Sequence, residues 1–185
     1  MADQPGLFAH GPAEAMHGRG AVLSADGVYR YRLWRVWDPD RLPTAFVMLN
    51  PSTADASADD PTIRRCAGFA RSWGAGGIVV ANLFAFRATD PADLARAQAI
   101  GVDVAGPDRD AHLRAAFSPV DSVVCAWGAC SLVRPELVRH LFSLIPAGIE
   151  VTCLGTTKHG QPKHPLYLAA STKRVAFIPP GVRRG

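Results

Sequence analysis

Short runs of apolar residues alternate along the chain with segments in which apolar residues recur every three or four positions. The continuous runs lie at residues 44–49, 77–83, 122–127 and 150–154. Runs of this length that are apolar on both faces are typical of strands in a parallel sheet covered by helices. The pattern therefore predicts four buried strands.

The segments between these runs have the spacing of amphipathic helices. The clearest are residues 62–73, which follow Pro61, and residues 132–144. Further helical segments are expected to begin at Asp90-Pro91 and to cover residues 108–117. Strands that alternate with helices predict an α/β fold, a three-layer α/β/α sandwich with a mostly parallel, four-stranded core sheet.

The two ends of the chain depart from this alternation. Residues 1–20 are rich in Gly, Pro and Ala without periodicity, which predicts a flexible N-terminal arm. Residues 21–38 show a rough period of two on either side of a turn and predict a β-hairpin. Near the C-terminus we expect a short helix at residues 167–170 and an extended segment at residues 175–178.

Composition places the chain among globular proteins. Of its 185 residues, 48% are hydrophobic and 19% are charged, a balance that argues against a disordered chain. The length suits one domain, which we assign to residues 21–185. Neither a run of about 20 apolar residues nor a signal-peptide pattern is present, so we expect a cytoplasmic protein that does not insert into membranes.

Net charge and cysteine content exclude few classes of function. The formal net charge of +4 is compatible with a polyanionic partner such as nucleic acid. The four cysteines form no C-x-x-C pair and are interpreted as structural thiols. His159 and His164 lack a third ligand at a suitable spacing, so neither a metal nor another cofactor is expected.

Polar or conformationally special residues lie at or after the end of each of the four predicted strands. They are Asn50-Pro51-Ser52, Asn82, Trp127-Gly128 and, after Gly155, the pair His164-Pro165. In sheets with parallel strands, ligands bind in the loops at the carboxyl ends of the strands. We therefore expect these residues to converge on one binding site.

Three of these side chains have both a functional and a structural interpretation. Asn50 either holds a water or a polar ring edge, or starts a turn before a proline. Asn82 either reads the edge of a flat heterocycle or caps the end of its strand. His164, in a loop stiffened by prolines, either stabilises a developing oxyanion or is an ordinary surface histidine.

Three aspartates follow the first predicted strand and also have two interpretations. Asp55, Asp59 and Asp60 offer carboxylates for general-base or cation-binding chemistry. The simpler interpretation for Asp59 or Asp60 is a helix N-cap, because they directly precede the helix that begins near Pro61. This leaves Asp55 as the catalytic candidate of the three.

The strand-end motifs together resemble those of the uracil-DNA glycosylase superfamily. The segment Met48-Leu49-Asn50-Pro51-Ser52 is similar to the first motif of the branches that use Asn, and residues 79–83 resemble the strand whose terminal Asn reads the base. Residues 123–129 are similar to the strand that ends in Trp-Gly, and residues 163–166 to the late His-Pro loop. The order and approximate spacing agree over residues 44–168.

The sequence resembles a second family more closely, but no activity is known for that family. The segments LNPSTAD, DDPTIRRC, NLFAFRATDP and HPLYL are similar to those of a bacterial and phage family known only as the domain of unknown function numbered 1643. The functional expectations below therefore come from the superfamily resemblance.

That resemblance implies cleavage of the N-glycosidic bond of uracil or a modified base. Asn50 would position a water, and His164 would donate to the departing base. The flipped base would stack on Phe84 or Phe86. The implied base-binding residues are Leu49, Pro51, Ser52, Asn82, Phe84, Phe86, Trp127 and Gly128.

The same resemblance implies DNA or a nucleotide as the partner. Basic residues would hold phosphates, and Leu166 or Tyr167 would replace the side chain that wedges into a duplex. The implied nucleic-acid contacts are Arg64, Arg65, Arg87, Lys163, Leu166 and Tyr167. Two alternatives stay open: a non-catalytic nucleic-acid or nucleotide binding module, and an enzyme that acts on a small nucleoside or nucleotide.

Overall fold

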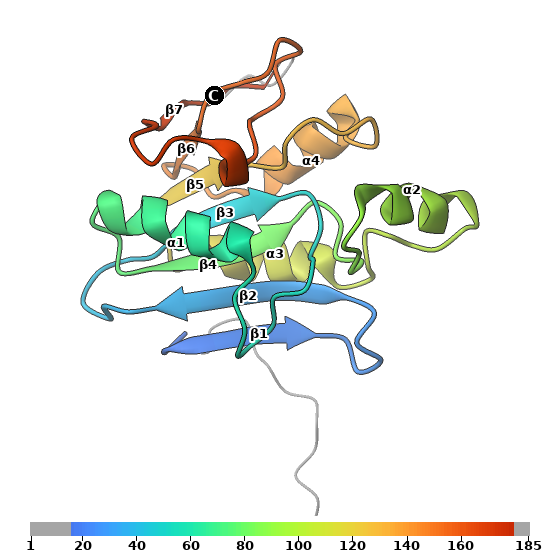
Figure 1. The fold of residues 1–185 in the computed structure, drawn as a ribbon, viewed down its shortest axis with the longest axis horizontal. Helices are drawn as coiled ribbons and strands as arrows, with labels where there is room; N and C mark the ends of the chain where they lie inside the picture. Colours follow the sequence, from blue (N-terminus) through green and yellow to red (C-terminus); the bar gives the residue numbers. More distant parts are fainter. Residues whose placement is uncertain (1–15, 180–185) are drawn as a thin grey trace, which may run out of the picture.

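A single seven-stranded sheet forms the centre of the molecule. The structure is a computed structural model that describes residues 16–179. The strands follow the order β1-β2-β4-β3-β5-β6-β7 across the sheet (Figure 1). Their bounds are β1 Arg19–Leu23, β2 Arg30–Val36, β3 Thr44–Met48, β4 Gly77–Asn82, β5 Ser122–Cys125, β6 Glu150–Cys153 and β7 Val175–Ala176.

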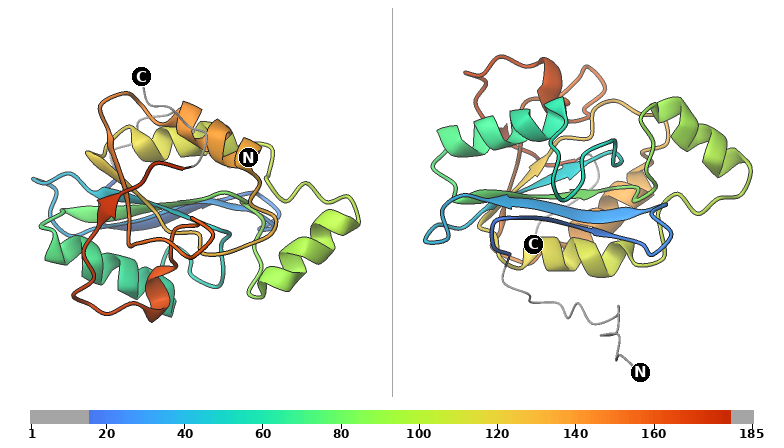
Figure 2. Two further views of the ribbon diagram at one scale, coloured as in Figure 1. Left: turned by 90° about the horizontal axis from the view of Figure 1, so that it is seen from above. Right: turned by 60° about the horizontal axis from the view of Figure 1, so that its bottom comes forward.

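Helices lie on both faces of this sheet. Helix α1 covers one face, and α3 and α4 cover the other, while α2 projects beyond the ends of the parallel strands (Figure 2). A single 3-10 turn, η1, packs against α1. The bounds are α1 Pro61–Ser72, α2 Pro91–Ala99, α3 Arg109–Phe117, α4 Pro135–Leu144 and η1 Pro165–Tyr167.

Strand direction changes across the sheet. Neighbours β4-β3, β3-β5 and β5-β6 are parallel, whereas β1, β2 and β7 are antiparallel to the strands beside them. The prediction of a mixed α/β fold is confirmed, but that of a mostly parallel four-stranded core sheet is confirmed only in part. The expected hairpin of β1 and β2 does not stand apart, because β2 pairs with β4 from Arg32↔Ala81 to Val36↔Gly77 and so extends the sheet.

Two hydrophobic clusters fill the space between the sheet and its helices. Val47 and Val79 belong to the cluster that α3 and α4 complete, whereas Phe46 and Val80 belong to the cluster that α1 completes. Successive residues of a strand point to opposite faces, so a strand covered on both sides must be apolar throughout. This explains the continuous apolar runs.

Several element bounds differ from those expected. Strand β1 begins at Arg19, inside the segment predicted as an arm, and residues 1–15 of that arm lie outside the described residues. The helix expected at residues 167–170 is instead the 3-10 turn at Pro165–Tyr167, which begins where Pro165 presets φ. Of the predicted extended segment at residues 175–178, Val175–Ala176 pairs with β6.

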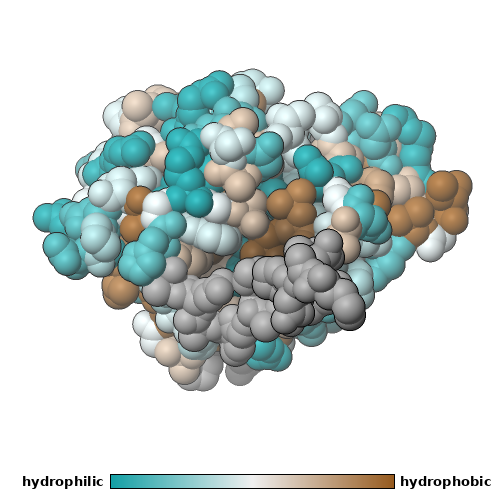
Figure 3. All heavy atoms as spheres, turned by 90° about the horizontal axis from the view of Figure 1, so that it is seen from below, coloured by the Kyte–Doolittle hydropathy of each residue, from teal (hydrophilic) through white to brown (hydrophobic). Residues whose placement is uncertain are grey.

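The surface seen from below in Figure 3 is mostly hydrophilic. Brown, hydrophobic colour gathers near its centre and at the edge on the α2 side. Over the part of the chain that the structure describes, no helix is both long and apolar enough to cross a membrane.

The start of α1 gives a test of this local structure. Asp60 Oδ1 accepts a hydrogen bond of 2.8 Å from the backbone N–H of Ile63. We predict that Asp60→Ala lowers the free energy of unfolding by about 1 kcal/mol, as measured by urea unfolding, because this N-cap bond is lost. Asp108→Ala is the matched control, since Asp108 precedes α3 without a side-chain cap bond. Its loss should be about 0.5 kcal/mol or less, and equal losses would contradict the assignment.

Candidate functional site

A cavity of about 580 Å³ opens where β3, β4 and β5 end. The start of α1 and the turn η1 complete its walls. Many of the residues expected at a site line it: Leu49, Asn50, Ser52, Asn82, Trp127, Gly128, His164, Leu166 and Tyr167. Residues more than a hundred positions apart in the sequence thus meet at one place, the edge where parallel strands end.

The remaining expected residues do not line this cavity. They are Pro51, Asp55, Arg64, Arg65, Phe84, Phe86, Arg87 and Lys163. Conversely, the cavity includes polar residues to which the sequence assigned no binding role, above all Arg30, and Asp60, which was assigned only a capping role.

Asn82, the last residue of β4, presents an unsatisfied amide to the cavity. Its side chain is 3% exposed, and neither Nδ2 nor Oδ1 has a hydrogen-bond partner. A buried polar group without a partner costs about 1–3 kcal/mol, and native structures contain few of them. Asn82 therefore has an N–H donor group and a carbonyl acceptor, side by side, available for a ligand.

Asn50 is held by the main chain. Its Nδ2 donates to the carbonyl oxygens of Pro51, at 3.0 Å, and Ala88, at 2.8 Å. Both amide hydrogens are used, which leaves Oδ1 to accept from a water or a ligand. The contacts combine the two interpretations of Asn50, because the side chain fixes a turn and still presents an acceptor.

His164 lies in the cavity as a neutral imidazole. Its Nδ1 accepts from the backbone N–H of Leu166 at 3.3 Å, so the ring proton resides on Nε2. Burial lowers the pKa of His164, and the charge of Asp60 opposes this shift only in part. His164 thus offers an N–H donor.

Gly128 allows the end of β5 to approach His164. Its φ is +75°, a left-handed conformation that favours glycine, and a Cβ at this position would lie 3.4 Å from the Cβ of His164. The Gly128 N–H also donates to the carbonyl of Pro162 at 3.0 Å. The Trp-Gly motif therefore has a definite structural role beside the cavity.

The aromatic rings at the cavity differ from those expected. Phe84 is buried in the hydrophobic cluster beneath α3, and Phe86 packs edge-on against Tyr29. The rings that line the cavity are Trp127, whose indole N–H donates to Gln161 Oε1 at 2.7 Å, and Tyr167, which is 88% exposed. A planar ligand would find its aromatic contacts on these two residues.

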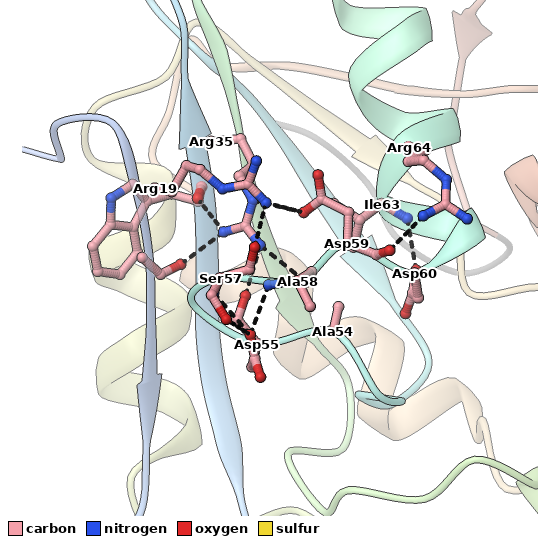
Figure 4. Close-up of polar contacts among 12 residues, drawn as sticks. Arg19, Arg35, Ala54, Asp55, Ser57, Ala58, Asp59, Asp60, Ile63 and Arg64 are labelled. Carbon is pink, nitrogen blue, oxygen red and sulfur yellow. Dashed lines mark hydrogen bonds and ion pairs between the residues drawn. The ribbon is translucent and has the colours of Figure 1, made fainter.

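One wall of the cavity is the loop of residues 49–60, and Arg35 of β2 holds it in place (Figure 4). Its Nη2 donates to the carbonyls of Asp55, at 2.6 Å, and Ala58, at 3.3 Å. Its Nε pairs with Asp59 Oδ1 at 2.7 Å. Arg19 Nη2 pairs with the same oxygen at 3.2 Å, and Figure 4 shows both arginines beside the loop.

This loop separates the roles of two aspartates. The Asp55 carboxylate turns back on its own loop, where Oδ1 accepts from the backbone N–H groups of Ser57 and Ala58, both at 2.8 Å. These bonds lower the pKa of Asp55, and the carboxylate lies away from the cavity. Asp60 both caps α1 and lines the cavity, so it is the carboxylate available there.

The basic residues expected to contact phosphates are mostly engaged by main-chain oxygens. Arg64 donates to the carbonyl of Asp59 at 2.5 Å, and Arg87 to that of Gly27 at 3.1 Å. Arg65 donates to the carbonyl of Leu168 and lies over the ring of Phe69. The exposed positions among them are Arg64 and Lys163.

Arg30 was missed, and its local sequence shows why. It lies in the interleaved arginines of β2, a pattern that indicates only an amphipathic strand. In the structure it is 2% exposed, and its Nη1 donates to the carbonyl of Ala54 at 2.6 Å. Burial lowers the pKa of Arg30 to about 10.

The cysteines are free thiols, and most of them are buried. Cys66, Cys125 and Cys153 are buried and free, and Cys130, also free, is half-buried at the cavity. Among residues 16–179, no three His, Cys, Asp or Glu side chains are grouped so that they could hold a metal ion.

Acidification tests the lowered pKa of the half-buried His164. Because the pKa of His164 is lowered in the folded protein, the unfolded chain takes up this proton at a higher pH than the folded chain. The stability that His164 contributes is fully present above its ordinary pKa of about 6.5 and is lost as the pH falls below that value.

We therefore predict that the wild type loses more stability between about pH 8 and about pH 5.5 than His164→Gln, as measured by urea unfolding. His159→Gln, at an exposed histidine of the same loop, should follow the wild type. Equal losses for wild type and His164→Gln would show that His164 is not buried as a neutral ring.

Comparison with known proteins identifies a family but no activity. A family profile described as "Protein of unknown function (DUF1643)" matches residues 30–166, which include every strand from β2 to β6 and every residue lining the cavity except Tyr167. No curated protein and no solved structure matches the chain.

Proposed function

The chain belongs to the DUF1643 family, and for this member we propose binding of a nucleobase in the cavity, followed by hydrolysis of its N-glycosidic bond. The observation that carries the proposal is the buried amide of Asn82, which has no partner and lines the cavity. The resemblance of the strand-end motifs to the uracil-DNA glycosylase superfamily supports the same reaction, and with it a fold of that type.

An amide such as Asn82 is complementary to the edge of a nucleobase. Uracil and related bases present a ring N–H beside a carbonyl oxygen. The carbonyl oxygen of an amide can accept from this N–H, and its N–H can donate to this oxygen. Binding such an edge would remove the cost of the two unpartnered atoms. Trp127 and Tyr167 would contact the faces of the ring.

The residues around Asn82 supply the groups that hydrolysis needs. The oxygen of a water held by Asn50 Oδ1 forms a bond to the sugar carbon C1′ as the bond from C1′ to the base nitrogen breaks. The electron pair of that bond leaves with the base, and His164 Nε2–H donates to the base oxygen on which the negative charge develops. The Asp60 carboxylate, in the same cavity, accepts the proton of the water.

The rim of the cavity favours access by a polymer. Tyr167 is 88% exposed, and Lys163 and Arg64 are exposed beside cavity residues. These side chains can stack on a base and contact phosphates as a nucleotide is flipped inward. DNA is therefore the proposed substrate, and binding without hydrolysis is the alternative.

Base release from oligonucleotides tests the function. Single- and double-stranded DNA containing uracil, hypoxanthine, xanthine or 5-hydroxymethyluracil would be incubated with the protein, and the free base measured. We predict release of one or more of these bases. Asn82→Ala and His164→Ala should each reduce the rate about a hundredfold or more, because each removes a contact made to the departing base.

His159→Ala is the matched control for His164→Ala, because His159 is exposed in the same loop and does not line the cavity. Its rate should stay within about twofold of the wild type. Release that survives substitution of Asn82 and His164 would contradict the mechanism. DNA binding without release of any base would favour the non-catalytic module.

A further inference from the structure

Arg30 is a buried cation whose hydrogen bonds are incomplete. Its side chain lines the cavity, and its Nε is buried without a partner. Arg35, on the same strand, differs from it, because Nε, Nη1 and Nη2 of Arg35 all donate to the surrounding loop and strand. The hydrogen bond from Nη1 to the Ala54 carbonyl therefore uses only part of the hydrogen-bonding capacity of the Arg30 guanidinium.

A β-bulge aims Arg30 at the cavity. Val22 pairs with Arg32, but the next residue of β1, Leu23, pairs with Arg30, so Tyr31 is the extra residue in β2. Strict alternation from Leu33 would turn Tyr31 toward α1, yet Tyr31 stacks on His112 of α3, at 4.6 Å between ring centroids. Arg30 consequently points to the α1 face, and bulges of this kind re-aim side chains beside functional sites.

The bulge places Arg30 close to Asn82. Strands β2 and β4 are antiparallel neighbours, with Arg32 opposite Ala81. Arg30 lies two residues before Arg32, and Asn82 lies one residue after Ala81, so both lie beyond this pair at the same end of the sheet. Two buried groups with unpartnered atoms, the amide of Asn82 and the guanidinium of Arg30 at its Nε, therefore line the same cavity.

The surrounding charges do not fully compensate Arg30. None of the ion pairs formed within residues 16–179 includes it. Asp60 is the strongest favourable charge, while Arg87 and Arg35 act against it, and burial outweighs the sum, so the pKa of Arg30 is lowered to about 10. An anion beside the guanidinium would supply the missing compensation.

We propose that Arg30 binds an oxyanion of the ligand, and that the substrate class is a nucleobase derivative bearing a carboxylate or phosphate. This proposal rests on the proposed function, because it assigns to the same cavity a base edge at Asn82 and a negative group at Arg30. A guanidinium can donate two parallel, charge-assisted hydrogen bonds to two oxygens of either group. The cavity volume of about 580 Å³ is within the range of pockets that take whole small-molecule ligands, so either source fits.

Two matched pairs of probes distinguish the sources of the oxyanion. Isothermal titration of the full chain would compare uracil with 5-carboxyuracil, and deoxyuridine with deoxyuridine 5′-monophosphate. We expect the anionic member of one pair to bind about tenfold or more tightly than its neutral partner, as a buried charge-assisted hydrogen bond requires. Preference within the first pair places the oxyanion on the ring, and preference within the second places it on the sugar.

Variants of Arg30 and Arg35 separate recognition from support of the loop. Arg30→Gln should bring the anionic and neutral probes to within about twofold of each other, and Arg30→Lys, which keeps the charge, should retain part of the preference. Arg35→Gln is the matched control, since Arg35 holds the same loop without lining the cavity. It should weaken both members of a pair alike.

The outcomes separate this inference from the proposed function. If neutral probes bind, or base is released from DNA, while neither anionic probe binds more tightly than its partner, Arg30 has no ligand role and the function stands. A preference that survives Arg30→Gln, or that disappears equally in Arg35→Gln, also overturns the inference. If no probe binds and no base is released, the nucleobase cavity itself is wrong. If Arg30→Gln does not fold, Arg30→Lys is compared with the wild type instead. An unchanged preference for the anionic probe in Arg30→Lys, together with a reduced preference in Arg35→Gln, would count against Arg30.

Discussion

The hydrogen bonds from the Arg35 guanidinium to the loop of residues 49–60 are the contacts on which the cavity depends. This loop follows β3 and, apart from one short turn, makes few backbone hydrogen bonds of its own, so its carbonyl groups need donors. Arg35 donates to two of these carbonyl groups from β2, and Asp59 pairs its carboxylate with the same guanidinium. With the loop held there, Asp60 is placed to cap α1, and α1 then closes one face of the sheet. Removal of this one side chain would therefore loosen the loop, the start of the helix and the wall of the cavity together.

The cavity contains groups that do not serve folding. The side-chain amide of Asn82 and the Nε of Arg30 are buried without partners, and burial lowers the pKa of the His164 imidazole. Each of these costs stability. Departures from good local packing that gather at one place are typical of functional sites. The two hydrophobic clusters on either side of the sheet supply the stabilisation that offsets this loss.

The residues of the candidate site that lie at strand ends could be predicted from the sequence. Asn50, Asn82 and Trp127 directly follow or end apolar runs, and parallel strands must bring such positions to one edge. The positions of two carboxylates in the loop after β3 did not follow from the sequence: Asp55 turns back on Ser57 and Ala58, whereas Asp60 reaches the cavity. The choice depends on how the loop folds back onto Arg35, a contact across about twenty residues that no local pattern encodes.

The sequence by itself determined the alternation of strands and helices, because a strand covered on both faces must be apolar along its whole length and a helix on its surface must be apolar along one stripe. It also determined which polar residues stand at the strand ends. Only the tertiary structure decided that β2 joins the sheet beside β4, that a bulge at Tyr31 turns Arg30 toward Asn82, and that the phenylalanines after β4 lie away from the cavity. These outcomes rest on pairing between distant segments, where a shift of one residue exchanges the two faces of a strand.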